Sequence, residues 1–283
     1  MRRILAIGGT GRVGRQVVGQ LAAAGAAVRV MARHAEAAGL PAEVEMARGD
    51  LTVPESLDAC LAGIDAVFLV WTAPIDTVDA VLARIARQAR RIVFLSAPLK
   101  TKHPFFQQPN APRAVPERIE RRIEESGREW TFLRPGMFAA NALGFWGAQI
   151  RAGGTVRWPY LEAPTAPVDE RDIAAVAVRA LCEEGHAGAE YVLTGPESLT
   201  QREQVETIGR AIGRRLRVEE ISAEELRREW GAPRAVADML LNAWAAAMGQ
   251  PAFVNSTVEE ATGRPARRFF EWACDHAAEF RES

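Results

Sequence analysis

A glycine-rich turn near the start of the chain most constrains the possible folds. Residues 8–14, GGTGRVG, stand between an apolar run, Arg3–Ile7, and an amphipathic stretch, Arg12–Ala24. In a strand–turn–helix unit, one such glycine permits the tight turn, another lets the backbone approach a pyrophosphate, and a third allows the helix to pack closely on the strand. The N–H groups at the start of the helix then favour an anion. The turn therefore predicts a dinucleotide-binding sheet, and a glycine turn without a ligand is the alternative.

Apolar runs alternate with amphipathic stretches through the first half of the chain, which predicts a parallel sheet covered by helices on both faces. The expected strands are Arg3–Ile7, Ala27–Met31, Val44–Ala47, Ala66–Trp71, Arg91–Ser96 and Glu129–Arg134. The expected helices between them are Arg12–Ala24, Pro54–Leu61, Thr77–Ala89 and Pro116–Ser126. The predicted fold class is α/β, a Rossmann-type, doubly wound parallel sheet.

The alternation loosens after residue 135. The expected helices there are Phe138–Ile150, Asp169–Cys182, Gln201–Ile212, Arg234–Met248 and Arg267–Phe280, with a strand at Tyr191–Leu193. After Ser222 the pattern indicates helices only. We therefore expect residues 1–152 to form the dinucleotide-binding domain. Residues 153–283 are expected to form a smaller, mostly helical C-terminal cap over the substrate, with some strands returning to the main sheet.

Charge and cysteine content exclude several classes of protein. The chain has 35 basic and 36 acidic side chains and a net charge of −1, without the basic excess of a nucleic-acid-binding protein. It contains no apolar run of about 18 residues that would predict a membrane span, and its first strand begins too early for a signal peptide. Cys60, Cys182 and Cys274 lie far apart and lack metal-ligand spacing. We expect no metal site, no disulfide and a cytoplasmic location.

The residues after the second and third strands indicate NADP(H) in preference to NAD(H). An NAD site usually offers Asp or Glu to the ribose after the second strand, whereas here Arg33 follows the strand and the first carboxylate is Glu36. Arg33 would bind a 2′-phosphate through charge-assisted hydrogen bonds, and Arg12 would flank the same phosphate. Otherwise both are solvated surface residues. Asp50 and Leu51 are expected to contact the adenine side, with a role as a turn acceptor as the alternative for Asp50.

Several stretches resemble the NmrA-like group of atypical short-chain dehydrogenases. They are residues 8–14, Gly49–Leu51, the segment from Glu120 to Asn141 with WTFLRPGMF at 130–138, VDERDIA at 168–174, and a closing segment, Val258–Phe270, with TGRP. Within the group, the chain looks most like bacterial relatives of ergot-alkaloid reductases of the festuclavine dehydrogenase type. The resemblance implies a Rossmann-type fold, an NADP-binding N-terminal part and a substrate cleft under a C-terminal cap.

The resemblance leaves two functional classes open. The group contains reductases of quinones, imines, aryl dyes and phenolics, and also redox-sensing regulators that bind the cofactor without turning it over. Many members carry a Tyr or His four residues before a helix Glu. Here Glu120 matches that Glu, and Pro116 stands at the position in question. Acid catalysis by a side chain at that position is therefore excluded.

The chain also lacks a Tyr-x-x-x-Lys catalytic pair. Its only tyrosines, Tyr160 and Tyr191, are followed four residues later by Pro164 and Gly195. Hydride transfer itself needs only the cofactor, an oriented acceptor and a dry pocket. An iminium acceptor is already cationic and needs no proton donor, whereas a carbonyl or quinone does. The missing pair favours iminium, quinone or enone-like acceptors, or no catalysis.

Ser96 and His103 are the candidate catalytic residues, as proton donors. Ser96 ends the fifth strand, where a hydroxyl satisfied by the backbone is the alternative. His103 lies in a long Pro-rich loop, Pro98–Pro116, which is either a lid over a cleft or a mobile surface segment.

The remaining expected site residues follow from the carboxyl ends of the strands. The predicted cofactor-binding residues are Gly8, Thr10, Gly11, Arg12, Val13, Gly14, Arg33, Asp50, Leu51, Trp71, Thr72, Ser96, Pro135, Met137 and Phe138. The predicted substrate pocket comprises Trp71, Pro98, Phe138, Asn141, Trp158 and Tyr160.

The leading hypothesis is an NADPH-dependent oxidoreductase acting on a small or mid-sized apolar organic acceptor. The alternatives are a non-catalytic NADP(H) sensor that acts through a protein partner, and an isomerase or epimerase that retains its cofactor.

Overall fold

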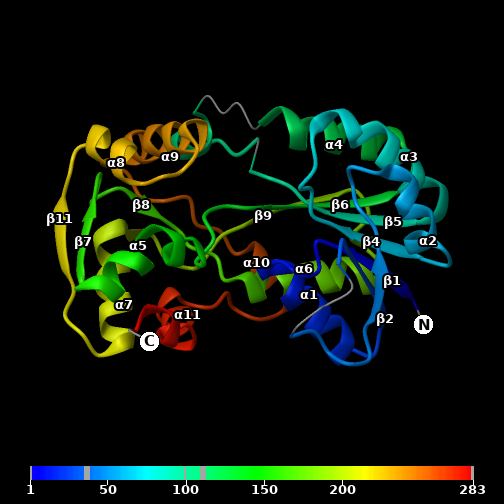
Figure 1. Cartoon of the computed structure of the whole chain (residues 1–283), viewed down its shortest axis with the longest axis horizontal. Coiled ribbons are helices and arrows are strands. Elements are labelled where there is room, and N and C mark those ends of the chain that lie inside the picture. Colours follow the sequence, from blue (N-terminus) through cyan, green and yellow to red (C-terminus); the bar gives the residue numbers. More distant parts are fainter. Residues whose placement is uncertain (1, 35–38, 99, 109–112, 282–283) are drawn as a thin grey trace.

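A seven-stranded parallel sheet forms the centre of the computed structural model, which describes residues 2–34, 39–98, 100–108 and 113–281 (Figure 1). In spatial order the strands are β3 (Glu45–Arg48), β2 (Ala27–Ala32), β1 (Arg3–Ile7), β4 (Ala66–Leu69), β5 (Arg91–Leu95), β6 (Glu129–Pro135) and β9 (Ala189–Leu193). The order reverses between β1 and β4, so the crevice at their carboxyl ends is where a doubly wound sheet binds its ligand. The predicted fold class is confirmed.

Helices cover both faces of this sheet, as Figure 1 shows. On one face lie α1 (Arg12–Ala23), α6 (Glu170–Cys182) and α10 (Thr257–Thr262). On the other lie α2 (Leu57–Leu61), α3 (Val78–Gln88) and α4 (Ala114–Glu125). The central strands β1, β4 and β5 are mostly apolar, as expected for strands that helices bury from both sides.

The apolar residues on the two faces of the sheet are taken together as the first apolar cluster. A second apolar cluster lies beyond the carboxyl edge of the sheet, at the left of Figure 1. Its helices are α5 (Asn141–Ala152), α7 (Gln201–Ile212), α8 (Ala223–Glu229), α9 (Arg234–Ala247), α11 (Phe269–Asp275) and α12 (Ala277–Phe280). Buried tryptophans dominate it, with Trp146, Trp158, Trp244 and Trp272 each at most 1% exposed. These large rings let a small region exclude water from its interior.

The two clusters divide the chain differently from the expected boundary at residue 152. Helix α5 was expected in the first region, yet Trp146 and Ile150 pack in the second cluster. Strand β9 returns from beyond the boundary to the edge of the main sheet, as expected, whereas helix α6, also from beyond the boundary, covers one face of that sheet. The packing partners of these amphipathic segments lie far away in the sequence, so local patterning does not reveal them.

Short strands in the second region were not predicted. Strand β7 (Thr155–Trp158) pairs in parallel with β11 (Arg217–Glu220), and β8 (Pro164–Thr165) pairs with β10 (Leu199–Thr200). Each has at most four residues, too few for an alternating pattern to stand out. The expected helix at 267–280 is divided in two at His276, while helices alone follow Ser222 in the described chain, as expected. The 3₁₀ turns are η1 (Pro54–Ser56), η2 (Ile75–Thr77) and η3 (Pro104–Phe106).

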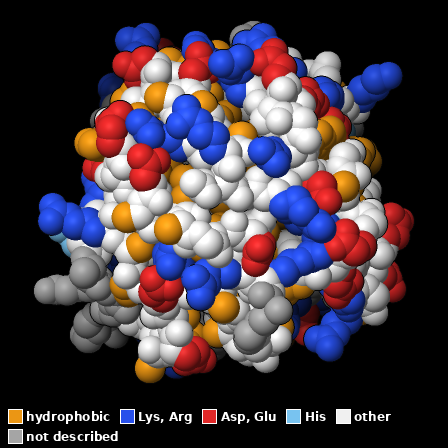
Figure 2. Space-filling view, turned by 90° about the vertical axis from the view of Figure 1, so that its right-hand side faces the viewer, with side chains coloured by type: hydrophobic (Ala, Val, Ile, Leu, Met, Phe, Trp, Pro, Cys, Tyr) orange, Lys and Arg blue, Asp and Glu red, His pale blue; other side chains and the backbone are white. Residues whose placement is uncertain are grey.

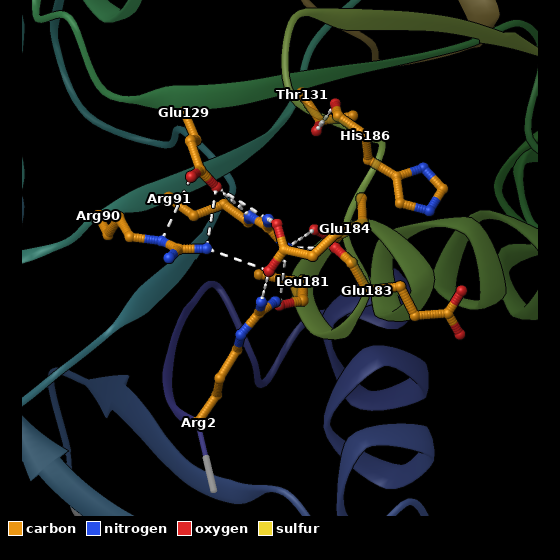
Figure 3. A network of polar contacts seen from close by, with 10 residues as sticks. Arg2, Arg90, Arg91, Glu129, Thr131, Leu181, Glu183, Glu184 and His186 are labelled. Atoms are coloured by element: carbon orange, nitrogen blue, oxygen red, sulfur yellow. Dashed lines mark hydrogen bonds and ion pairs between the residues drawn. The ribbon is translucent and has the colours of Figure 1, made fainter.

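An arginine network joins the amino ends of the strands to the end of α6 (Figure 3). Arg91 starts β5 and is 2% exposed; its guanidinium donates to the carbonyl of Ala180 and to the carboxylates of Glu129 and Glu184. Arg2 donates to the Leu181 carbonyl at 2.8 Å. The network therefore satisfies carbonyls at the carboxyl end of α6 that would otherwise lack partners.

Figure 2 shows the face at the right-hand side of Figure 1, where the chain begins. Basic and acidic side chains are interspersed over this face, without a field of one sign. Among the described helices, none is both long and apolar enough to cross a membrane.

Candidate functional site

The first part of the site is a cavity of about 430 Å³ at the carboxyl ends of β2 and β3, which we call the Arg33 cavity. Its lining includes Gly8, Thr10, Arg33, His34, Asp50, Leu51 and Thr72. Arg33 and His34 directly follow β2, and their side chains are exposed at the rim. Glu36, the first carboxylate after this strand, lies outside the described residues.

Asp50 is both a turn acceptor and part of this cavity. Its Oδ1 accepts hydrogen bonds from the backbone N–H and the hydroxyl of Thr52, both at 2.8 Å. These two bonds, with a smaller contribution from the charge of Arg33, hold the pKa of Asp50 below its usual value. The carboxylate is therefore ionised and fixed at the wall of the cavity, beside the guanidinium.

A second cavity of about 280 Å³, the Asn141 cavity, lies on the other side of the glycine turn. It is lined by Gly8, Arg12, Val13, Gly14, Phe138, Asn141 and Glu170, among others. Helix α1 begins here without a hydrogen-bonded side-chain cap and without an acidic residue in its first turn. Its first N–H groups and the positive end of its dipole therefore favour an anion at this point.

The glycine turn fits a dinucleotide pyrophosphate. Gly8 has φ of +84°, a conformation that few other residues adopt. A Cβ atom at Gly14 would lie 2.0 Å from the carbonyl oxygen of Gly8, so only glycine lets α1 start this close to β1. The backbone thus remains bare where a phosphate approaches, as in the predicted site.

A third cavity of about 260 Å³, the Leu240 cavity, opens between the sheet and α9. The sheet side contributes Ser96, Pro98, Pro135, Met137 and Phe138, and the facing side contributes Phe105, Phe106, Met239, Leu240 and Ala243. Apolar side chains predominate, with Ser96, Gln108 and Arg113 as polar members. Residues 99 and 109–112 of the expected lid lie outside the described residues.

Shared residues join the three cavities into one row. Gly8 lines both the Arg33 and the Asn141 cavities, and Phe138 lines both the Asn141 and the Leu240 cavities. The row follows the carboxyl edge of the sheet and ends against α9. An elongated ligand in the first two cavities would therefore end at Phe138, facing an apolar compartment.

Ser96 is held by a buried ion pair. Its hydroxyl lies 2.6 Å from Oε1 of Glu120, and Arg134 donates to both oxygens of that carboxylate, at 2.9 and 2.7 Å. Glu120 and Arg134 are 5% and 2% exposed. Arg134 also pairs with Glu190, which in turn binds Lys100. Ser96 therefore donates its hydroxyl proton to a carboxylate that Arg134 holds in place.

His103 lines none of the three cavities, but it lies beside the third, at a small cavity that it shares with Phe105, Phe106 and Met137. Its Nδ1 accepts from the backbone N–H of Phe105 at 3.2 Å, which caps η3. Its Nε2 lies 3.0 Å from the carbonyl oxygen of Pro251, to which it donates. Both ring nitrogens contact the backbone, so His103 joins the loop to the segment after α9, and its role as proton donor stays a prediction.

Of the aromatic residues expected in the substrate pocket, some pack in the apolar core and one lines the cavities. Trp158 is fully buried in the second cluster, and its indole N–H donates to Gln201 at 2.8 Å, so it is a core residue. Tyr160 packs against the same cluster. Trp71 donates to the Ala73 carbonyl and packs on the face that carries α3. Phe138 alone of these predicted aromatics lines the row of cavities described above.

The structure separates the two arginines that were expected to share one phosphate. Arg33 lines the first cavity and Arg12 the second, on opposite sides of Gly8. Arg12 also approaches Glu279, with 3.7 Å between the charged groups. The two cavities share Gly8, and the 2′-phosphate contact expected of Arg12 stays a prediction.

Sequence reasoning missed several lining residues. Met239 and Leu240 come from α9, and nothing local distinguishes them from other apolar residues of an amphipathic helix. His34 was left unassigned, although its position after Arg33 was a usable signal. Glu170 lines the second cavity from the start of α6, where a carboxylate normally indicates a favourable helix start and not a ligand.

Comparisons with known proteins place this geometry in a family. The NAD(P)H-binding family matches residues 8–184. A (4-alkanoyl-5-oxo-2,5-dihydrofuran-3-yl)methyl phosphate reductase of Streptomyces griseus is 41% identical over 98% of this chain and 99% of its own length. An NAD(P)H azoreductase of Xenophilus azovorans is 36% identical over the same shares.

Solved structures show the same fold. An NADPH-dependent quinone oxidoreductase of Escherichia coli, in complex with NADPH, superposes with a TM-score of 0.80 at 21% identity, over 96% of this chain and 99% of that one. NmrA, a negative transcriptional regulator in complex with NADP, superposes with a TM-score of 0.74 at 16% identity, over 97% and 94%.

Proposed function

The chain belongs to the NAD(P)H-binding family, as an oxidoreductase of the NmrA-like, atypical short-chain dehydrogenase type, and from this premise we propose that it is an NADPH-dependent reductase of apolar organic acceptors. The row of cavities carries the proposal. The Arg33 and Asn141 cavities offer a place for a dinucleotide, and the apolar Leu240 cavity begins at the residue where the dinucleotide would end.

NADP(H) is proposed over NAD(H) because Arg33 and His34 line the cavity at the end of β2. Charge-assisted hydrogen bonds to a phosphate are worth about 1.5–3 kcal/mol each. Asp50, the carboxylate in this lining, already accepts two bonds from Thr52. Gly8, Gly11, Val13 and Gly14 would then bind the pyrophosphate, and Pro135, Met137 and Phe138 would bound the nicotinamide end.

The polar contacts of Ser96 favour acceptors that need no proton from a side chain. The bound cofactor supplies a hydride, and the protein orients the acceptor in a dry compartment. Because Ser96 donates its proton to Glu120 and also lines the Leu240 cavity, its oxygen is available there as a hydrogen-bond acceptor only. Ser96 would thus orient an acceptor that is cationic or a hydrogen-bond donor, such as an iminium. For a quinone or an enone-like acceptor, water would supply the proton.

The named relatives are compatible with this range. The names of the Streptomyces and Xenophilus proteins describe reductases of unsaturated acceptors, a dihydrofuranone phosphate and azo compounds. The apolar Leu240 cavity favours a reductase over a non-catalytic sensor, because a sensor needs no acceptor compartment next to its cofactor. The closer likeness to ergot-alkaloid reductases and the cytoplasmic location stay predictions.

The test is an anaerobic assay of NADPH consumption with a quinone, a cyclic iminium and an enone, each at saturating cofactor. We expect turnover of at least one acceptor. Ser96→Ala should change the rate with the iminium by less than about 10-fold, since losing a true proton donor costs about 100-fold or more. Saturable NADPH binding without turnover of any acceptor would favour the sensor. Absence of NADPH binding would refute both.

A further inference from the structure

Glu170 is a buried carboxylate with an unused oxygen. The residue begins α6 and is 3% exposed, and its Oε2 has no hydrogen-bond partner within the described chain. Of the buried side-chain atoms in that condition, it is the one carboxylate oxygen. A buried charged group without a partner is costly, and native structures rarely keep one without a reason.

Charged groups around Glu170 do not supply the missing donor. His276 Nε2 lies 3.6 Å from the other carboxylate oxygen, Oε1, while its Nδ1 is 2.6 Å from Glu279. Glu279 in turn faces Arg12. These contacts lie on the side of α12 and involve Oε1. Glu170 also lines the Asn141 cavity, together with Gly8 and Gly14.

We propose that Glu170 is a cofactor-positioning residue whose Oε2 accepts a hydrogen bond from a ribose hydroxyl on the nicotinamide half of bound NADPH. The inference rests on the proposed function, since it needs a dinucleotide in the row of cavities. The cofactor group that contacts Glu170 is not a phosphate, because a carboxylate and a phosphate are both negatively charged and repel each other. It must also lie one step from the pyrophosphate, because Glu170 shares its cavity with Gly8 and Gly14. The ribose meets both conditions, whereas the carboxamide is at the far end of the ring.

The experiment compares NADPH with 2′,5′-ADP, which lacks the nicotinamide half, by calorimetric titration of the full-length protein. Glu170→Met removes the acceptor at similar length, and we expect it to weaken NADPH binding about 10–150-fold, the range for a hydrogen bond to a charged group. Binding of 2′,5′-ADP should be unchanged. Glu170→Gln keeps a neutral acceptor and should lose less than Glu170→Met. Glu279→Gln, a partly exposed carboxylate of the same cluster, is the matched control and should bind NADPH as the parent does.

The thermal midpoint of the ligand-free protein is the second measurement. It shows whether each variant remains folded, so that weaker NADPH binding reports a lost contact with the cofactor and not a loss of structure. Equal or tighter NADPH binding by Glu170→Gln and Glu170→Met would overturn the inference, as would equal losses for NADPH and 2′,5′-ADP. If the parent protein does not bind NADPH, the proposed function fails first. A parent that binds NADPH, with variants that bind equally well, refutes the role of Glu170 alone.

Discussion

At the scale of single residues, Arg33 and Arg12 differ in the cavity that each lines, and therefore in the part of a bound dinucleotide that each could contact. Arg33 is exposed at the rim of the first cavity and faces Asp50, whereas Arg12 stands at the start of α1 in the second. The two arginines therefore line different cavities, and both of these cavities include Gly8 of the glycine turn. Under the proposed function, we expect selection for a 2′-phosphate to depend on Arg33, with His34 beside it.

Replacing Arg33 by Ala should weaken NADPH binding about 10–150-fold and leave NADH binding nearly unchanged, because NADH has no 2′-phosphate. Quenching of tryptophan fluorescence measures both affinities. Arg48→Ala, which removes an exposed arginine at the end of the neighbouring strand, is the control for general loss of positive charge. Equal weakening of NADPH and NADH would mean that Arg33 is structural.

Asp172 makes stability depend on pH. It accepts the backbone N–H of Arg267 at 2.7 Å, and burial raises its pKa from 3.8 to about 6. Between these two values the folded carboxyl keeps a proton that the unfolded chain has lost, so its contribution to stability falls as pH rises through this window. Above the folded pKa, the cost of the buried charge is present in full.

Asp172→Asn keeps the acceptor for Arg267 and removes the charge. We expect a higher free energy of unfolding than the parent at about pH 8 and no difference at about pH 4, where both side chains are neutral in the folded state. Denaturant titrations at the two pH values measure this, with the exposed Asp76→Asn as control. A gain of equal size at both pH values would contradict the assignment.

At the scale of elements, the contact between β1 and α1 forms the centre of the site. Helix α1 starts without a side-chain cap and approaches the turn so closely that Gly14 abuts the Gly8 carbonyl. The opposite ends of the strands are held by the Arg91 network, which joins β5 and β6 to the end of α6 (Figure 3). The carboxyl edge is thereby left for the ligand, while the amino edge is fixed.

Gly14→Ala tests this contact. Its Cβ would meet the Gly8 carbonyl oxygen at 2.0 Å, so backbone must move, with an expected loss of about 1–3 kcal/mol in stability and loss of NADPH binding. Gly19→Ala is the matched control in the same helix. Its Cβ would have nothing within 4 Å, and an Ala inside a helix should gain about 0.5–1 kcal/mol. Similar melting temperatures for the two variants would show that the turn tolerates a side chain.

At the scale of the whole molecule, two apolar cores meet along the row of cavities. The sheet provides Ser96, Pro98 and Phe138, and α9 of the second core provides Leu240 across the compartment. Under the proposed function, the acceptor site depends on how the two cores are placed against each other, and cofactor binding depends mainly on the first core.

Leu240→Ala should enlarge the acceptor compartment without changing NADPH affinity. Because a lost methylene contact is worth about 1–3 kcal/mol, kcat/KM for a small acceptor should fall by 10-fold or more relative to a bulkier analogue. A pair of quinones that differ in ring size provides the measurement. Met248→Ala, next to the end of α9 and 41% exposed, should leave the ratio unchanged. An unchanged ratio in Leu240→Ala would remove this cavity as the acceptor site.

Local order along the chain was sufficient to predict the sheet, the glycine turn and the place of Arg33 and Asp50. Each depends on residues that are close together in the sequence. Hydrophobic periodicity, turn-forming residues and the ends of strands can be recognised over such short distances. Phe138 and Ser96 also followed, because every parallel strand ends at the same edge. Trp158 and His103 did not, since an aromatic ring or an imidazole has the same local signature in a core, a cap or a pocket.

The amino-acid sequence by itself determined the fold class and the place of Gly8, Arg33 and Asp50 at one cavity, because both arise from short-range patterns. The tertiary structure alone decided the separation of Arg12 from Arg33, the acceptor compartment under α9, and the unpartnered oxygen of Glu170. Each of these depends on burial and on hydrogen-bond partners from distant segments, such as His276 for Glu170 and Pro251 for His103. Whether a polar group is satisfied is a property of the packed molecule, and a linear pattern does not contain it.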